Sequence, residues 1–212
     1  MKLHQVVTAI LVILLLAAIV RSPLQGRQGV EDGGEPIALG LVRASPDSFL
    51  GKEVEFVVQV HAVPTSWNPF VTRFGSADFR ALSVWTDEQA LWLPEEFEHP
   101  FGPVFARRGT PVEAVFAAAQ PYQRYRMHGR VKECFLGRAW IEVDSATRLA
   151  GEVGEGTVLH AGRAVQLMAV QQWKLALEDL ERALAGDLPA RAVTELEALR
   201  TACAEALSKS SR

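Results

Sequence analysis

The side chains able to do chemistry are scattered along the chain. The five histidines, at positions 4, 61, 99, 128 and 160, include no pair spaced three or four residues apart, so no helix face carries two imidazole ligands for a metal. Three carboxylates and an imidazole at residues 95–99 are better explained as a solvated acidic loop than as a cation site. The sequence has no G-x-S-x-G, no G-x-x-x-x-G-K-[ST], no G-x-G-x-x-G and no C-x-x-C. We therefore expect neither catalysis nor a bound cofactor or metal.

The charge and the cysteine content disfavour two further classes of protein. The 212 residues carry 22 Lys+Arg and 25 Asp+Glu, a formal net charge of -3, so the surface as a whole is not an electrostatic footprint for nucleic acid. Two cysteines, Cys134 and Cys203, are too few for a disulfide scaffold or a zinc cluster. We expect two separate thiols, with a Cys134–Cys203 disulfide as the alternative in an oxidising compartment.

A basic stripe is the most regular candidate binding surface. Between residues 124 and 132, apolar or small side chains alternate with basic ones, as in a strand with one buried face and one exposed face. The candidate partner-binding residues on the exposed face are Arg124, Arg126, Arg130 and Lys132. Cross-strand ion pairs with Glu53 and Glu55 would explain much of the stripe without a ligand. An acidic protein partner or a membrane surface is the next interpretation, and nucleic acid is disfavoured.

The basic stripe belongs to a series of short strands interrupted by one helix. Alternating hydrophobicity predicts strands at residues 53–62, 79–86, 89–93, 124–132 and 138–143. Before the fourth of these, Thr110-Pro111-Val112-Glu113 combines an N-cap hydroxyl, a proline at the first helical position and a glutamate at N3. This capping-box pattern predicts a helix that ends before Pro121. A strand over residues 112–118 is its competitor.

The order of three strands, a helix and two strands resembles an oligonucleotide/oligosaccharide-binding (OB) barrel. The likeness covers about residues 37–149 and includes FLGKEV at 49–54, YRMHGRV at 125–131 and WIEV at 140–143. Barrels of this family bind ligands across strands two and three and the neighbouring loops, so the resemblance implies Trp85 and Trp92 as an alternative stacking platform. The loop after the first strand adds Trp67 and Phe70 as candidate partner-binding residues. Packing inside or over the barrel is the simpler interpretation of the tryptophans.

The C-terminal part of the chain has a helical pattern. Apolar and small residues predict two helices before Pro189 and a third over residues 190–207; those of the first two helices are Ala164, Leu167, Trp173, Ala176, Leu180, Ala183 and Leu184. The spacing resembles a tetratricopeptide (TPR) repeat followed by a capping helix, with a departure at His160, where such repeats favour a large apolar side chain. Since one repeat is not stable alone, we expect the helices to lean on the barrel or on a partner.

An apolar run opens the chain. Residues 6–20 contain Thr8 as their only polar side chain and lie between Lys2 and Arg21. Fifteen helical residues span roughly 22 Å, a length that suits a cleavable signal as well as an anchor. Because no A-x-A cleavage pattern and no cysteine for lipidation follow, we expect residues 1–21 to remain as a transmembrane anchor. Residues 22–36 are predicted to be a flexible tether with a reach of about 20 Å.

The predicted protein is α+β in class and has four parts: an anchor at residues 1–21, a tether at 22–36, a five-stranded OB-like barrel at 37–150 and a TPR-like helical module at 151–212. We expect a single-pass protein of the inner (cytoplasmic) membrane with its body on the periplasmic side, although Arg21 and Arg27 favour the reverse orientation by the positive-inside count. Its expected partners are the lipid bilayer and an integral-membrane protein complex, beside which it would act as a non-catalytic binding or assembly subunit. The alternative is a nucleic-acid- or oligosaccharide-binding barrel.

Overall fold

The computed structural model describes residues 36–210. The predicted anchor, residues 1–21, and nearly all of the predicted tether, residues 22–36, lie outside the described residues. Within residues 36–210, no helix has the length and apolar character needed to cross a membrane. The described elements, in chain order, are α2 (Leu39–Ala44), η1 (Pro46–Phe49), β1 (Glu53–Ala62), β2 (Phe79–Thr86), α3 (Pro94–Phe97), β3 (Gly102–Arg107), α4 (Pro111–Ala118), β4 (Arg124–Phe135), β5 (Arg138–Arg148), α5 (Glu155–Ala169), α6 (Trp173–Ala183) and α7 (Ala190–Ser210).

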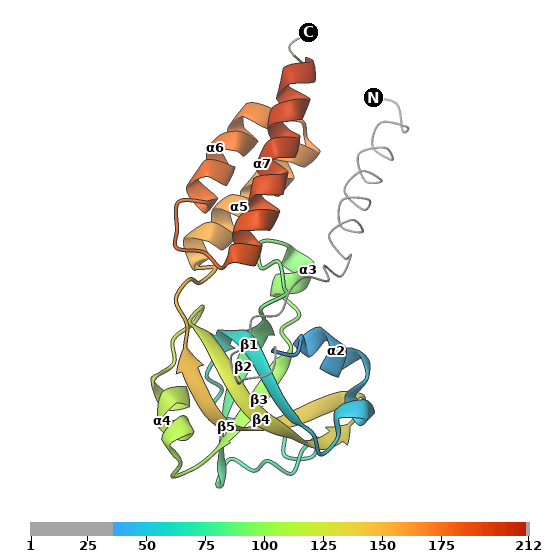
Figure 1. Ribbon diagram of the computed structural model, residues 1–212, viewed down its shortest axis with the longest axis vertical. Helices are drawn as coiled ribbons and strands as arrows, with labels where there is room; N and C mark the ends of the chain where they lie inside the picture. The colour runs from blue at the N-terminus through green and yellow to red at the C-terminus, as the bar shows by residue number, and fades with distance from the viewer. Residues whose placement is uncertain (1–35, 211–212) are drawn as a thin grey trace, which may run out of the picture. The chain divides into compact units, whose positions relative to one another are not determined.

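The five strands close into a barrel in the order β1-β2-β3-β5-β4, with β4 returning to β1 (Figure 1). All pairs are antiparallel except β3 with β5, which is parallel at Phe105 and Glu142. This closed barrel followed by helices is compatible with the predicted OB-like architecture, and the α+β class is confirmed.

The barrel interior is filled by the alternating apolar residues that predicted the strands. On β1, Val54, Phe56, Val58 and Val60 are buried, and on β4 the buried side chains are Tyr125, Met127 and Val131. Between them, Gly129 pairs with Val143 at a bulge in the β4–β5 ladder. A Cβ atom at Gly129 would overlap the backbone carbonyl oxygen of Glu142, so the strands approach more closely here than any other residue allows.

The predicted third strand at residues 89–93 is wrong. These residues form a turn, and the third strand is β3, Gly102–Arg107. The Gln89 side chain closes the turn: its amide nitrogen donates to the carbonyl oxygens of Glu96 (2.8 Å) and His99 (2.9 Å), and its oxygen accepts from the Thr86 N–H. Leu91 and Trp92 are buried against the C-terminal helices. Their apolar spacing therefore reflects burial of a loop under helices, not a half-buried strand.

The predicted helix after β3 is confirmed as α4, but its start differs from the predicted capping box. Thr110 makes no side-chain cap, because its hydroxyl donates to the Arg107 carbonyl oxygen at 2.6 Å. Glu113 accepts from Arg80 of β2 at 2.8 Å and from the Gly109 N–H, one residue before the N-cap, at 3.4 Å. The glutamate that was expected to cap the helix therefore ties α4 to the barrel wall.

The three C-terminal helices form where the sequence predicted them, and α6 packs against both α5 and α7 (Figure 1). Their buried face joins β2 and the following loop in one apolar cluster, made of Trp85, Leu91, Trp92, Val153, Ala161, Ala164, Ala176, Leu180, Ala183, Ala192, Leu196 and Cys203. Small residues dominate the helix contacts, which lets the helices approach closely. The described residues 36–210 belong to one compact unit, in which the helices contact the barrel side through Trp85, Leu91 and Trp92.

Candidate functional site

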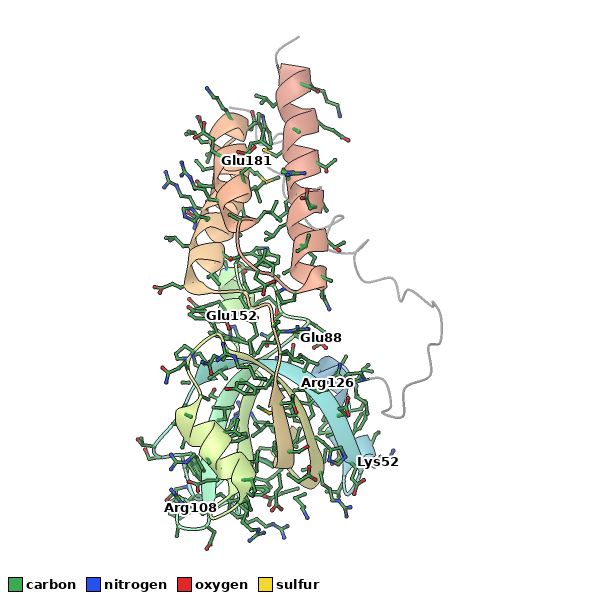
Figure 2. The ribbon with its side chains drawn as sticks, turned by 60° about the vertical axis from the view of Figure 1, so that its left-hand side comes forward. Lys52, Glu88, Arg108, Arg126, Glu152 and Glu181 are labelled. Atoms are coloured by element: carbon green, nitrogen blue, oxygen red, sulfur yellow. The ribbon has the colours of Figure 1, made fainter. Side chains whose placement is uncertain are left out.

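Each of the four cations of the basic stripe has an acidic partner within the described chain. Because β1 runs antiparallel to β4, Glu53 lies opposite Arg130 and Glu55 opposite His128. Arg130 pairs with Glu53, and Arg126 reaches Glu55 at 3.8 Å. The cross-strand explanation of the stripe is thus supported at these two arginines, which are half exposed, as Figure 2 shows for Arg126 on the barrel surface.

The two ends of the stripe pair elsewhere. Arg124 donates to both carboxylate oxygens of Asp87, at 2.6 and 2.7 Å, and this hydrogen bonding raises the pKa of the arginine. Both side chains are largely buried. Lys132 lies 3.6 Å from Glu142 of β5, which Arg107 also contacts at 3.2 Å. The stripe is thus a set of cations neutralised by the barrel's own carboxylates, and Arg124 in particular is a structural group.

The loop between β1 and β2 separates its two candidate residues. The Trp67 indole N–H donates to the Phe74 carbonyl oxygen at 2.5 Å, and its ring meets the Phe105 ring edge-on at 5.4 Å. Phe70 lies at the loop tip and is 88% exposed, with its N–H held by the Asn68 side-chain oxygen. Trp67 therefore covers the barrel, and Phe70 is the member of the pair that a partner can reach.

The alternative stacking platform is not accessible in this structure. Trp85 is 1% exposed and Trp92 is 5% exposed. The Trp85 indole N–H donates to the Phe97 carbonyl oxygen at 2.9 Å, and its ring lies against His61, Phe97 and Tyr122 at centroid distances of 4.7, 5.0 and 5.7 Å. No base or sugar can stack on either tryptophan without displacing the residues that cover it.

Most of the outward face of β2 is covered by the protein itself, since Phe79, Ala81 and Trp85 are buried. Trp85 packs under the C-terminal helices, while Phe79 and Ala81 belong to a second cluster with Phe74, Phe105 and Trp140, onto which Trp67 packs. Phe74 stacks flat on Phe105, with their ring planes 4° apart and centroids 4.6 Å apart. Strands two and three carry the ligand face in OB barrels, and here that face is occupied by internal contacts.

A groove that the sequence did not predict lies beside the β4–β5 turn. We call it the hairpin groove; it has a volume of about 470 Å³ and is lined by Arg43, Glu98, His99, Phe101, Leu136, Arg138 and Trp140, among others. Its two arginines come from α2 and from the first residue of β5. The exposed Leu136 at the tip of a two-residue turn was the one local signal that a sequence search could have used.

Two further polar groups also escaped the sequence analysis. Asp179 of α6 is buried, with His160 Nδ1 at 3.0 Å and Arg163 Nε at 3.2 Å from its carboxylate oxygens. This contact explains why a histidine stands here in place of an apolar residue: His160 of α5 binds the Asp179 carboxylate of α6. Glu88 lies near the junction of barrel and helices (Figure 2), and its Oε2 is buried without a hydrogen-bond partner. Burial raises the pKa of Glu88, which a hydrogen bond with Thr86 partly offsets.

The described residues contain no group of three or more His, Cys, Asp or Glu side chains placed to hold a metal ion. The two cysteines are free thiols: Cys134 donates to the Pro46 carbonyl oxygen at 3.1 Å and Cys203 to that of Trp173 at 3.2 Å. Burial raises the pKa of both thiols, which lowers their reactivity at neutral pH. No protein-family model matches the chain, and no curated protein matches its sequence.

Proposed function

We propose that this chain is a non-catalytic binding or assembly subunit, anchored in the inner membrane by its N-terminal segment and docked beside an integral-membrane protein complex on the periplasmic side. The observation that carries the proposal is the covered outward face of β2. Phe79, Trp85 and Phe105 occupy the surface on which an OB barrel would hold a ligand, so the barrel acts as a scaffold. A partner would then bind to surfaces other than this face of the barrel.

Exposed apolar side chains mark where a protein partner would contact the molecule. Leu159, Val170 and Leu175 are exposed on or next to α5 and α6, and Phe70 is exposed on the barrel loop. Large exposed apolar residues are common singly, and several on one helical pair favour an interaction surface. We interpret α5, α6 and α7 as a TPR-like hairpin with a cap. The helices bury their inner faces mainly against one another and contact the barrel side through Trp85, Leu91 and Trp92, so their outer faces are left for a partner.

The N-terminal sequence supports the membrane part of the proposal. Residues 6–20 form an uninterrupted apolar run apart from Thr8, and the next fifteen residues are rich in Gly and charge. A segment of this kind inserts into a bilayer, and the following stretch would keep the barrel within about 20 Å of the lipid surface. The proposed partners of the protein are therefore the lipid bilayer and an integral-membrane protein complex.

Purification of the full chain in a mild detergent tests the proposal. After cross-linking in intact cells, a tagged chain should bring down one integral-membrane partner in constant stoichiometry, and Leu159→Glu together with Leu175→Glu should reduce the yield of that complex. Lys174→Glu, on the same helix as Leu175, is the matched control. A monodisperse, unaccompanied chain would contradict the proposal. Quenching of tryptophan fluorescence by single-stranded DNA or a glycan would instead favour the barrel as a ligand-binding domain.

A further inference from the structure

The hairpin groove has two arginines in its lining. Arg43 and Arg138 both line it, and neither makes an ion pair among the residues from 36 to 210, in contrast to the four cations of the basic stripe. Arg43 lies over the Phe101 ring at 5.3 Å. Burial is the main cause that lowers the pKa of Arg43; the attraction of nearby Glu96 raises it, and the smaller repulsion of Arg138 lowers it. Glu98 is the carboxylate in the groove lining. An anion between the arginines would relieve the repulsion.

A hydrogen-bond donor in the groove wall also lacks an acceptor. Trp140 lines the groove and is 95% buried, and its indole Nε1 is one of two buried side-chain polar atoms without a partner in the described chain. An unpaired buried donor costs about 1–3 kcal/mol. Oxygen-rich anions satisfy guanidinium groups, and the buried Trp140 indole beside them would sense an anion bound in the groove.

The tip of the β4–β5 hairpin adds an apolar contact beside these cations. Leu136 and Gly137 have φ values of 51° and 70°, the left-handed pair that a two-residue hairpin turn requires. Asparagine or glycine is the usual first residue of such a turn, and a leucine there costs roughly 1–2 kcal/mol. Leu136 is nevertheless 71% exposed and contributes to no core cluster. Phe135 beside it is also exposed. The apolar tip therefore faces outward next to two arginines that make no ion pair within the described part of the chain.

An apolar tip flanked by cations matches the boundary of a bilayer that contains anionic lipids. The side chains Leu136 and Phe135 suit the edge of the acyl region, and guanidinium groups suit headgroup phosphates. The position of Arg43 in the sequence favours a lipid ligand. Arg43 lies on α2, the first described helix after the apolar run at residues 6–20. An acidic peptide would satisfy the arginines but gives no reason for a left-handed exposed leucine.

We propose that the hairpin groove binds the phosphate of an anionic phospholipid headgroup, with Arg43 and Arg138 as phosphate ligands and Leu136 at the boundary of the acyl region. This inference rests on the proposed membrane attachment and adds to it a second, lipid-selective contact. It orients the barrel on the bilayer with the β4–β5 turn toward the lipid, leaving the outer faces of α5 and α6 for a protein partner.

Nuclear magnetic resonance of the full chain, labelled with ¹⁵N at the tryptophan indoles in dodecyl maltoside micelles, tests the site. The Trp140 resonance is the one lost in Trp140→Phe. Added phosphatidylglycerol should shift it saturably, while phosphatidylcholine should not. A surface charge contributes about 1 kcal/mol toward anionic lipid, so Arg43→Gln and Arg138→Gln should each weaken the apparent affinity about five-fold. Arg126→Gln, which removes a half-exposed cation of the basic stripe, should leave the affinity unchanged.

Soluble ligands separate a lipid site from a general anion site. Glycerophosphoglycerol should shift the same resonance more weakly than phosphatidylglycerol, and Leu136→Asn should weaken binding of the lipid but not of the soluble headgroup. The inference is overturned by equal shifts with phosphatidylcholine, by inorganic phosphate binding as tightly as the lipid, or by an effect of Arg126→Gln as large as that of Arg138→Gln. Retention of the groove variants in carbonate-washed membranes would show that membrane attachment holds in any of these cases.

Discussion

Trp85 is the β2 side chain in the apolar cluster shared with the C-terminal helices, so replacing it by alanine should destabilise the junction of barrel and helices. The side chain is fully buried, packs against three rings and donates one hydrogen bond to Phe97. A tryptophan buries about 150–250 Å², which at about 25 cal/mol per Å² corresponds to about 4–6 kcal/mol. Alanine retains part of that area, so we expect Trp85→Ala to lower the free energy of unfolding by about 3–5 kcal/mol. This is a large share of the 5–15 kcal/mol typical of a folded domain.

Urea unfolding of the full chain in a non-ionic detergent measures the loss, and two variants calibrate it. Trp85→Phe keeps most of the apolar area and removes the hydrogen bond, so it should cost about 1 kcal/mol. Phe70→Ala changes an exposed aromatic and should stay within about 0.5 kcal/mol. In hydrogen exchange, amides of α5 and α6 should lose protection in Trp85→Ala before those of β1. A loss below about 1 kcal/mol for Trp85→Ala would refute the reasoning that this residue couples helices and barrel.

Three smaller perturbations test other contacts. Gly129→Ala should lower the free energy of unfolding by about 1–3 kcal/mol in the same urea assay, because the new Cβ overlaps the Glu142 carbonyl; an unchanged midpoint would contradict the close strand approach. Burial raises the pKa of Glu88, so its ionised form disfavours the folded state, and stability should fall as pH rises from the ordinary glutamate range through the raised pKa. Glu88→Gln should abolish that fall in thermal unfolding recorded across the same pH range. Arg130→Ala should cost less than about 1 kcal/mol, since its pair with Glu53 is half exposed, and a larger loss would assign the stripe a greater structural role.

Four of the five strands could be predicted. In β1, β4 and β5 much of the strand alternates between buried and more exposed side chains, and β2 is an apolar run buried on both faces. The third strand could not be predicted, because β3 begins with Gly102-Pro103 and has only a short apolar run. Residues 89–93 have the hydrophobic pattern of a strand but form a turn. Their apolar residues are buried by α5–α7, and this is a tertiary contact that no local window contains. β4 and β5 also extend to Phe135 and Arg148, past the predicted ends, because ladder pairing continues through polar residues.

The contacts of the candidate site could be predicted only where the pairing register of two strands places the side chains next to each other. Once β4 is paired with β1, the ion pair of Arg130 with Glu53 follows from the register, while Arg126, opposite Val57, reaches Glu55 diagonally. Arg124 pairs with Asp87 instead, because the β2 turn folds over the end of β4. The hairpin groove brings together Arg43 and Arg138 from distant segments, and no sequence window contains both.

The N-terminal segment carries the central claim, that this protein works while held at a membrane. Its most direct test is the fate of the native chain in carbonate-washed membranes, read by intact mass. We predict that the protein stays in the membrane pellet at its full 23.2 kDa. Recovery in the soluble fraction of a chain that begins near residue 22 would contradict membrane anchoring and, with it, the proposed role beside a membrane complex.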